Sequence, residues 1–208
     1  MRSEFENSLR KHQSAFGIEL TGETISRLAD HYAAVLAANT LLHLVAPCSP
    51  EEFAVRHVLE SLTLLKHLPK DARFGDVGAG AGLPSIPCLV ARDDLKAVLI
   101  ESKEKKSTFL LETTEKLDLA GRAKVVNRQF EEVVPEAFEF VTCRALDKFS
   151  EKLPRLLKWA GRRTMLLYGG PNLEERLGTL GVQVSRELMP MSERRYLFVV
   201  DQSGKPFR

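Results

Sequence analysis

The chain has 208 residues, 44% of them hydrophobic, which is enough to bury the core of one domain with a small appendage. Its 30 basic and 28 acidic side chains leave a formal charge of +2, so charge alone does not indicate a nucleic-acid binder. The three cysteines lack metal-ligand spacing, the histidines form no zinc pattern, and we find no secretory signal and no apolar run of about 18 residues. We therefore expect a cytoplasmic protein with reduced cysteines, no metal and no membrane segment.

The first third of the chain is expected to be helical. Residues 3–16 form a short amphipathic piece that ends at Gly17, and residues 21–43 place their apolar side chains on one helical face. The sequence Ser49-Pro50-Glu51-Glu52 is a capping box, with proline at the first helical position, that begins a further helix. These helices predict an N-terminal helical extension over residues 1–68, ahead of a core over residues 69–208, within one compact unit.

From residue 69 the pattern changes to alternating strands and helices. Alternation of this kind predicts an α/β fold with a mostly parallel sheet flanked by helices. The last two extended segments are separated by a short turn, so we expect them to pair as a hairpin. The expected strands cover residues 73–77, 96–101, 123–127, 138–143, 164–168, 182–188 and 196–200, which makes a seven-stranded sheet.

A glycine-rich turn follows the first strand. Asp76 is followed by Gly78, Gly80 and Gly82 at alternate positions, which lets the backbone approach a ligand closely at the start of a helix. The spacing fits neither the dinucleotide fingerprint nor a P-loop. It is similar to the loop of S-adenosylmethionine (SAM) methyltransferases, whose Rossmann-like fold carries an antiparallel seventh strand. The alternative is a tight turn that needs glycine for structural reasons alone.

A second acidic residue supports a cofactor site. Glu101 ends the second strand, about 20 residues beyond Gly82. At the tip of that strand a carboxylate can accept hydrogen bonds from ribose hydroxyls. The alternative is an acid that only precedes the helix expected over residues 102–117.

Further motifs extend the resemblance. The loop continues as Leu83-Pro84-Ser85-Ile86-Pro87, an extension that most methyltransferases lack. Further matching pieces are the segment Val55 to Ser61, Lys105-Lys106 with Phe109-Leu110, Arg128, and Cys143-Arg144-Ala145. On all these pieces, the chain resembles the bacterial 16S rRNA (guanine-N7) methyltransferases, the RsmG or GidB family, from about residue 20 to residue 200.

The resemblance implies how the cofactor site is built. It places Gly78 and Leu83 against SAM, and it places Gln129 and Phe130 beside the adenine, with Gln129 hydrogen-bonding and the Phe130 ring stacking. Phe130 stands where the family usually has an acidic residue. The expected cofactor site consists of Asp76, Gly78, Gly80, Gly82, Leu83, Glu101, Gln129, Phe130 and Arg144.

Arg144 is also the expected catalytic residue. It ends the fourth strand, at the sheet edge where ligands bind in such folds, and would face the methionine end of SAM or the RNA. The alternative is a surface arginine that caps the strand.

The resemblance implies 16S rRNA of the small ribosomal subunit as the partner. The expected RNA contacts are Arg56, His57, Tyr168 and Arg195, and local basic clusters can bind phosphates although the whole chain is nearly neutral. Tyr168 stands where the family has a lysine. The alternatives are solvated basic faces and, for Arg56 and His57, an ordinary amphipathic helix with a core histidine.

The expected chemistry needs few catalytic groups. Guanine N7 carries a lone pair and no proton, so its methylation requires no general base, and positioning can supply most of the effect. The motif of exocyclic-amine methyltransferases is missing after the fourth strand, and Cys143 lacks an obvious base for a nucleophilic role. We expect a monomeric SAM-dependent rRNA guanine-N7 methyltransferase. A SAM methyltransferase of another RNA or small molecule, and a non-catalytic SAM- or RNA-binding paralogue, stay open.

Overall fold

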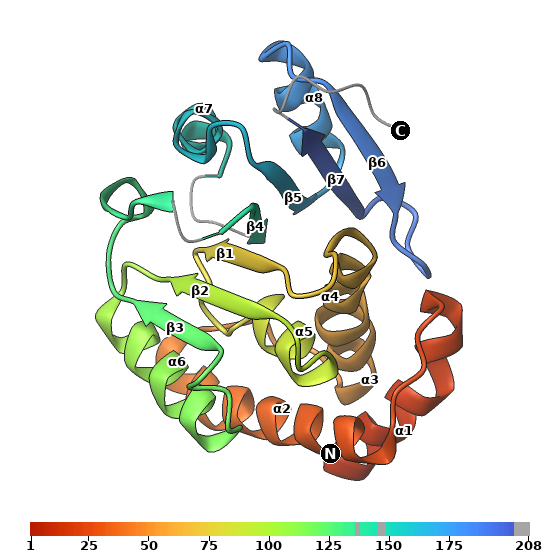
Figure 1. The fold of residues 1–208 in the computed structure, drawn as a ribbon. Coiled ribbons are helices and arrows are strands. Elements are labelled where there is room, and N and C mark those ends of the chain that lie inside the picture. The colour runs from red at the N-terminus through yellow and green to blue at the C-terminus, as the bar shows by residue number, and fades with distance from the viewer. Residues whose placement is uncertain (136–137, 145–148, 202–208) are drawn as a thin grey trace.

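A seven-stranded sheet forms the centre of the molecule (Figure 1). The computed structural model describes residues 1–135, 138–144 and 149–201. The strand order is β3-β2-β1-β4-β5-β7-β6, parallel from β3 to β5, with β7 antiparallel to both β5 and β6. The expected fold class and the terminal hairpin are confirmed. The strands are β1 (Arg73–Val77), β2 (Lys96–Ile100), β3 (Ala123–Val126), β4 (Phe140–Arg144), β5 (Thr164–Gly169), β6 (Val184–Leu188) and β7 (Tyr196–Asp201).

The N-terminal third is helical, as its apolar spacing predicts. The Thr21 side chain accepts a hydrogen bond from the Thr24 N–H, and the Ser49 side chain accepts one from the Glu52 N–H, so both expected helix starts are capped. The elements here are α1 (Arg2–His12), the 3-10 helix η1 (Gln13–Phe16), α2 (Gly22–Leu42), α3 (Pro50–Glu52), the π-helical segment η2 (Phe53–Leu59), α4 (Glu60–Leu62) and the 3-10 helix η3 (Thr63–His67).

The remaining helices connect the strands. None of the helices in the described parts of the chain has the length and apolar character of a membrane span. They are α5 (Ser85–Ala91), α6 (Glu104–Lys116), the 3-10 helix η4 (Phe130–Glu132), α7 (Phe149–Ala160) and α8 (Pro171–Thr179).

Two hydrophobic clusters cover the two faces of the sheet. On the first face, the N-terminal helices, α5 and α6 share one continuous cluster with β1 and β2, which includes Phe5, Phe53 and Leu99. On the second face, α7 and α8 pack over the middle of the sheet, with Leu153 and Leu177 buried. Each fully buried large apolar side chain contributes about 1.5–3 kcal/mol to folding.

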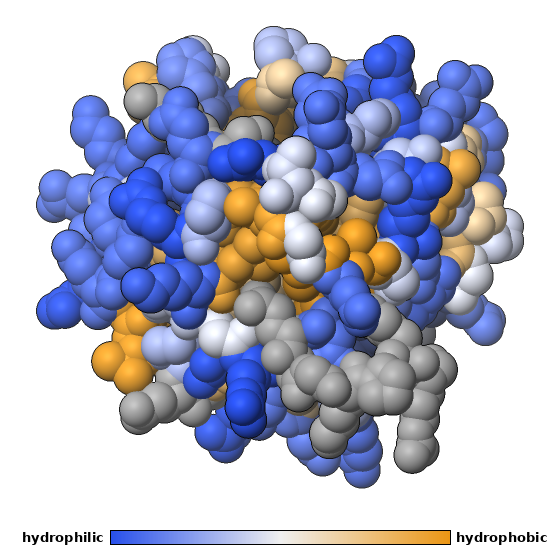
Figure 2. All heavy atoms as spheres, turned by 90° about the horizontal axis from the view of Figure 1, so that it is seen from above, coloured by the Kyte–Doolittle hydropathy of each residue, from blue (hydrophilic) through white to orange (hydrophobic). Residues whose placement is uncertain are grey.

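The side of the molecule that carries α7 and α8 is shown in Figure 2. Apolar side chains gather near the middle of this view, with hydrophilic side chains around them. Half-buried residues that pack against the second cluster include Trp159, Leu180 and Val182. Polar side chains thus surround the helices that close this half of the sheet.

Candidate active site

The main cavity, of about 560 Å³, lies at the carboxyl ends of the strands. Ligands of open α/β sheets bind at this edge. Its walls come from the glycine loop, the segment 44–46 after α2, residues 101–103 with Lys106 at the start of α6, and Lys152 of α7. The sequence-predicted residues that line it are Gly78, Gly80, Leu83, Glu101, Gln129, His57 and Arg144.

The glycine loop and Glu101 hold each other in place. The Gly80 N–H donates to Glu101 Oε2 at 3.1 Å, and the Lys103 N–H donates to Oε1 at 2.8 Å. Gly78 and Gly80 have φ angles of 74° and 50°, in the left-handed region that favours glycine. The carboxylate therefore lies at the cavity wall, held by two backbone N–H groups.

Asp76 and Gly82 lie behind the cavity wall. The Ser85 hydroxyl donates to Asp76 Oδ2 at 2.5 Å, whereas Oδ1 has no hydrogen-bond partner among the described residues. Burial raises the pKa of Asp76 to about 7. Gly82 has a φ of 76°, and a Cβ there would overlap the Ile86 side chain. Both residues thus shape the loop from behind.

His31 also supports the loop, which the sequence reasoning missed. Its ring is wholly buried, with Nε2 2.8 Å from the Ala81 carbonyl oxygen. Burial lowers the pKa of His31 to about 4, so the neutral ring donates from Nε2 to that carbonyl. The available signal was a histidine among the apolar residues of α2, which include Leu28 and Tyr32.

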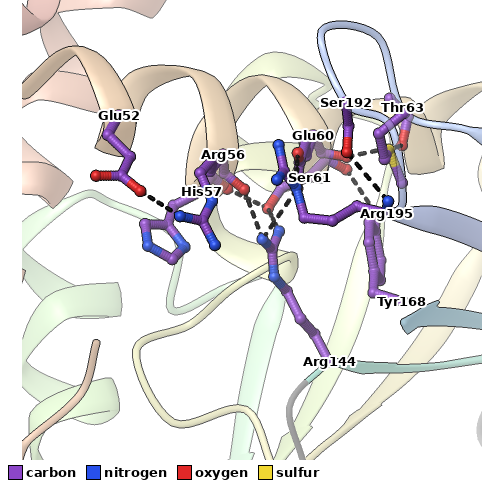
Figure 3. A network of polar contacts seen from close by, with 11 residues as sticks. Glu52, Arg56, His57, Glu60, Ser61, Thr63, Arg144, Tyr168, Ser192 and Arg195 are labelled. Atoms are coloured by element: carbon purple, nitrogen blue, oxygen red, sulfur yellow. Dashed lines mark hydrogen bonds and ion pairs between the residues drawn. The ribbon is translucent and has the colours of Figure 1, made fainter. Parts of the chain in front are cut away.

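A buried carboxylate joins two of the predicted arginines (Figure 3). The Glu60 side chain is 2% exposed, and its Oε1 and Oε2 accept hydrogen bonds from Arg195 Nε at 2.6 Å and Arg144 Nη2 at 3.2 Å. Arg144 also donates to the Arg56 carbonyl oxygen at 2.5 Å and to Ser61 Oγ at 3.4 Å. Arg144 is therefore fixed against the helical segment 56–61.

Tyr168 and Arg56 complete this network. The Arg144 guanidinium lies over the Tyr168 ring, 5.2 Å from its centroid, and the Tyr168 hydroxyl donates to the Ser61 carbonyl oxygen at 3.0 Å. Tyr168 is 7% exposed, so it lies beneath Arg144 and does not line the main cavity. The Arg56 side chain pairs with Glu52 at the surface. Only the carbonyl group of Arg56 reaches Arg144.

His57 lines the cavity as a neutral ring. Burial and the neighbouring charges of Arg144, Arg56 and Arg195 lower the pKa of His57 to about 3. Its ring is tilted against Phe53, with centroids 5.0 Å apart. The ring therefore offers hydrogen-bonding nitrogens without a positive charge.

Phe130 does not offer the expected stacking surface. Its side chain is 3% exposed, and its ring packs edge-on against Trp159, with centroids 5.5 Å apart. Trp159 in turn donates from its indole nitrogen to the Val133 carbonyl oxygen at 2.7 Å. The phenyl ring belongs to the second core cluster because Trp159 gives it an apolar partner there. Gln129, one residue earlier, lines the cavity as expected.

Cys143 is fully buried in β4, and Ala145, part of the motif that carried the family resemblance, lies outside the described residues. Three lysines, Lys103, Lys106 and Lys152, line the cavity. Among the described residues, no group of three or more histidine, cysteine or acidic side chains is arranged to hold a metal ion. The cavity thus combines a glycine loop, one carboxylate, a neutral imidazole and several cations.

Comparison with solved structures agrees with this fold. The methyltransferase domain of METTL16 superposes with a TM-score of 0.56 at 16% identity, covering 85% of this chain and 80% of that one. TrmK from M. capricolum, solved with S-adenosyl-homocysteine, gives a TM-score of 0.54 at 16% identity and covers 68% of this chain and 67% of that one. At this level of identity, the similarity concerns the fold.

Sequence comparison identifies the family. The protein named ribosomal RNA small subunit methyltransferase G of Sorangium cellulosum is 34% identical to this chain, over 84% of this chain and 76% of that protein. The protein of the same name from Chromobacterium violaceum is also 34% identical, over 88% of this chain and 89% of that protein. A family model described as rRNA small subunit methyltransferase G matches residues 24–188. The chain belongs to this family.

Proposed function

We propose that this protein transfers a methyl group from SAM to N7 of a guanine in 16S rRNA of the small ribosomal subunit. The observation that carries the proposal is one cavity in a chain of this family, where the glycine loop and Glu101 face His57 and Arg144. We further propose that the protein acts as a cytoplasmic monomer.

The residues present fit the cofactor. Gly78 and Gly80 line the cavity with φ angles of 74° and 50°, so backbone without side chains borders the space a cofactor would fill. Gly78, Gly80 and Leu83 would border SAM, Glu101 would accept hydrogen bonds from its ribose, and Gln129 would contact its adenine. When bound, SAM supplies an electrophilic methyl group on a sulfonium.

The surrounding side chains suit a nucleophile that has no proton to lose. His57 is neutral and Arg144 is a cation, so neither is prepared to act as a strong base. Positioning of the guanine against the methyl donor is then the main contribution of the protein.

Arg144 is the residue we propose to position the base or its phosphate. Among the described residues, three hydrogen bonds fix its guanidinium, to Glu60, the Arg56 carbonyl oxygen and Ser61. A guanidinium has five N–H groups, so donors remain for the guanine O6 or a phosphate oxygen. A donor aimed at N7 itself would occupy the reacting lone pair, so we assign Arg144 to the neighbouring acceptors.

The test is transfer of labelled methyl from SAM to small ribosomal subunits from a strain that lacks its own guanine-N7 enzyme, with mapping of the modified base. We expect label at N7 of a single guanine in 16S rRNA. Label on another base, or no transfer while calorimetry shows SAM binding, would contradict the proposed substrate.

A further inference from the structure

The second face of β1, β2 and β3 carries a row of cations. Arg73 lies beside Lys96 in the register of β1 and β2, and Val98 lies beside Lys124 in that of β2 and β3. The alternate residues of these strands, such as Ala97, pack in the first core cluster, so this row points the other way. We call Arg73, Lys96 and Lys124 the uncovered face.

No helix covers this face in the described part of the chain. Right-handed crossovers place the connection from β3 to β4 on this side of the sheet. In its described residues, 127–135 and 138–139, that connection forms only the three-residue helix η4. Helices α7 and α8 lie over the middle and the far half of the sheet (Figure 1). Arg73, Lys96 and Lys124 are consequently exposed, whereas Val98 between them is half-buried and packs against the second core cluster.

The cations of the uncovered face lack acidic partners. No carboxylate of a described residue forms an ion pair with Arg73, Lys96 or Lys124, whereas Arg92 and Arg122 pair with Asp94 and Asp93. The Glu139 carboxylate instead accepts a hydrogen bond from the Arg73 backbone N–H, at 3.3 Å. Like charges on adjacent strands repel each other, so this arrangement favours a bound polyanion over an empty surface.

A hollow borders the uncovered face, and further cations lie at the opposite end of the same strands, beside the main cavity. Arg73, Lys96 and Lys124 border a hollow of about 260 Å³ at the start of the strands. At the other end of β2 and β3, Arg128 and Lys152 border a small cavity of about 20 Å³ that shares Gly78 and Gln129 with the main cavity. Cations thus lie at both ends of these strands, with apolar residues of the second core cluster, such as Val77 and Ile100, between them.

We propose that the uncovered face is a second binding surface, for the phosphate backbone of the RNA whose base enters the main cavity. The inference rests on the proposed function, which supplies the RNA. Lysine and arginine side chains without carboxylate partners bind phosphates by releasing counterions, without reading sequence. This surface therefore contributes affinity and orientation, while the main cavity selects the base.

The test removes the three charges together, in the variant Arg73→Gln, Lys96→Gln, Lys124→Gln. Its control is Arg10→Gln, Lys11→Gln, Lys66→Gln, which removes three exposed cations from α1 and η3. The affinity for small ribosomal subunits is measured at several salt concentrations. Each phosphate contact contributes about 0.7 to the slope of log affinity against log salt, so the slope should fall by about 2. Between 50 and 200 mM salt, the unaltered protein should then lose about 20-fold more affinity than the variant.

The same variants are then assayed for methyl transfer. We expect a raised KM for the RNA substrate, with kcat and SAM affinity unchanged, and no such effect in the control. An unchanged salt slope in the triple variant, or a slope that falls equally in the control, overturns the proposal. If the unaltered protein binds the subunit without methylating it, the proposed function fails while the salt slopes still test this surface.

Discussion

Replacement of Glu60 by glutamine tests the buried network most directly. The change removes the charge that faces both Arg144 and Arg195 but keeps the shape of the side chain. Removing one partner of a buried ion pair costs about 3–5 kcal/mol, because the other charge is left uncompensated. The Arg195 side chain is 32% exposed and water can solvate part of its charge, so we expect about 3 kcal/mol.

The loss should appear both in stability and in activity. Chemical denaturation should report about 3 kcal/mol less free energy of unfolding, and the Tm should fall by roughly 6–12 °C. Methyl transfer should fall at least about tenfold in kcat, because Arg144 is no longer held, while SAM affinity changes little. Glu60→Asp, which keeps the charge, should recover part of both losses.

The matched control is Glu52→Gln, about two helical turns earlier, at the end of α3. Glu52 pairs with Arg56 and with no other described residue, and both side chains are exposed, so this change should cost less than about 1 kcal/mol. If Glu60→Gln behaved like Glu52→Gln in both assays, the reasoning that the buried carboxylate positions Arg144 would be refuted.

Three further predictions concern the loop and the core. His31 has a folded-state pKa of about 4 against 6.5 when unfolded, so its contribution of about 3 kcal/mol is present above pH 6.5 and lost as pH falls toward 4. The raised pKa of Asp76 acts in the opposite sense and is present in both proteins. Because His31→Gln lacks the buried imidazole, its denaturation should show a smaller loss of stability on acidification than that of the unaltered protein. An equal loss in the two proteins would contradict this assignment. Gly78→Val should abolish SAM binding in calorimetry, because Gly78 has a φ of 74° and lines the cavity; normal affinity would mean that the cofactor lies elsewhere. Phe130→Leu should cost about 1 kcal/mol of stability and leave SAM affinity within twofold, whereas a large loss of affinity would restore the stacking role.

Features encoded over short distances in the sequence were predictable. The strands of the sheet follow from apolar runs bounded by turn residues, and the loop from Asp76 to Gly82 follows from glycines that adopt positive φ angles. The Ser49 cap was predictable as well, although the π-helical segment it leads into was not. Local chemistry is sufficient for features of this kind.

Contacts between distant residues were not predictable in the same way. Arg195 and Arg144 were each singled out, but nothing near them in the sequence indicates that both reach Glu60, which lies 135 positions before Arg195. The direction of the Phe130 ring depended on Trp159, and the role of His31 depended on the position of the Ala81 carbonyl group. The division between residues 1–68 and the rest stays a prediction, although both parts contribute to one hydrophobic cluster.

The position of Arg195 has a consequence for the order in which the protein is made. Glu60 and Arg144 leave the ribosome well before the turn between β6 and β7, which carries Arg195. A nascent chain that lacks this hairpin has only one of the two arginine partners for its buried carboxylate. The charge balance beside the main cavity is therefore completed only after the turn between β6 and β7 has been synthesised, so an earlier nascent chain carries the buried carboxylate without its second cation.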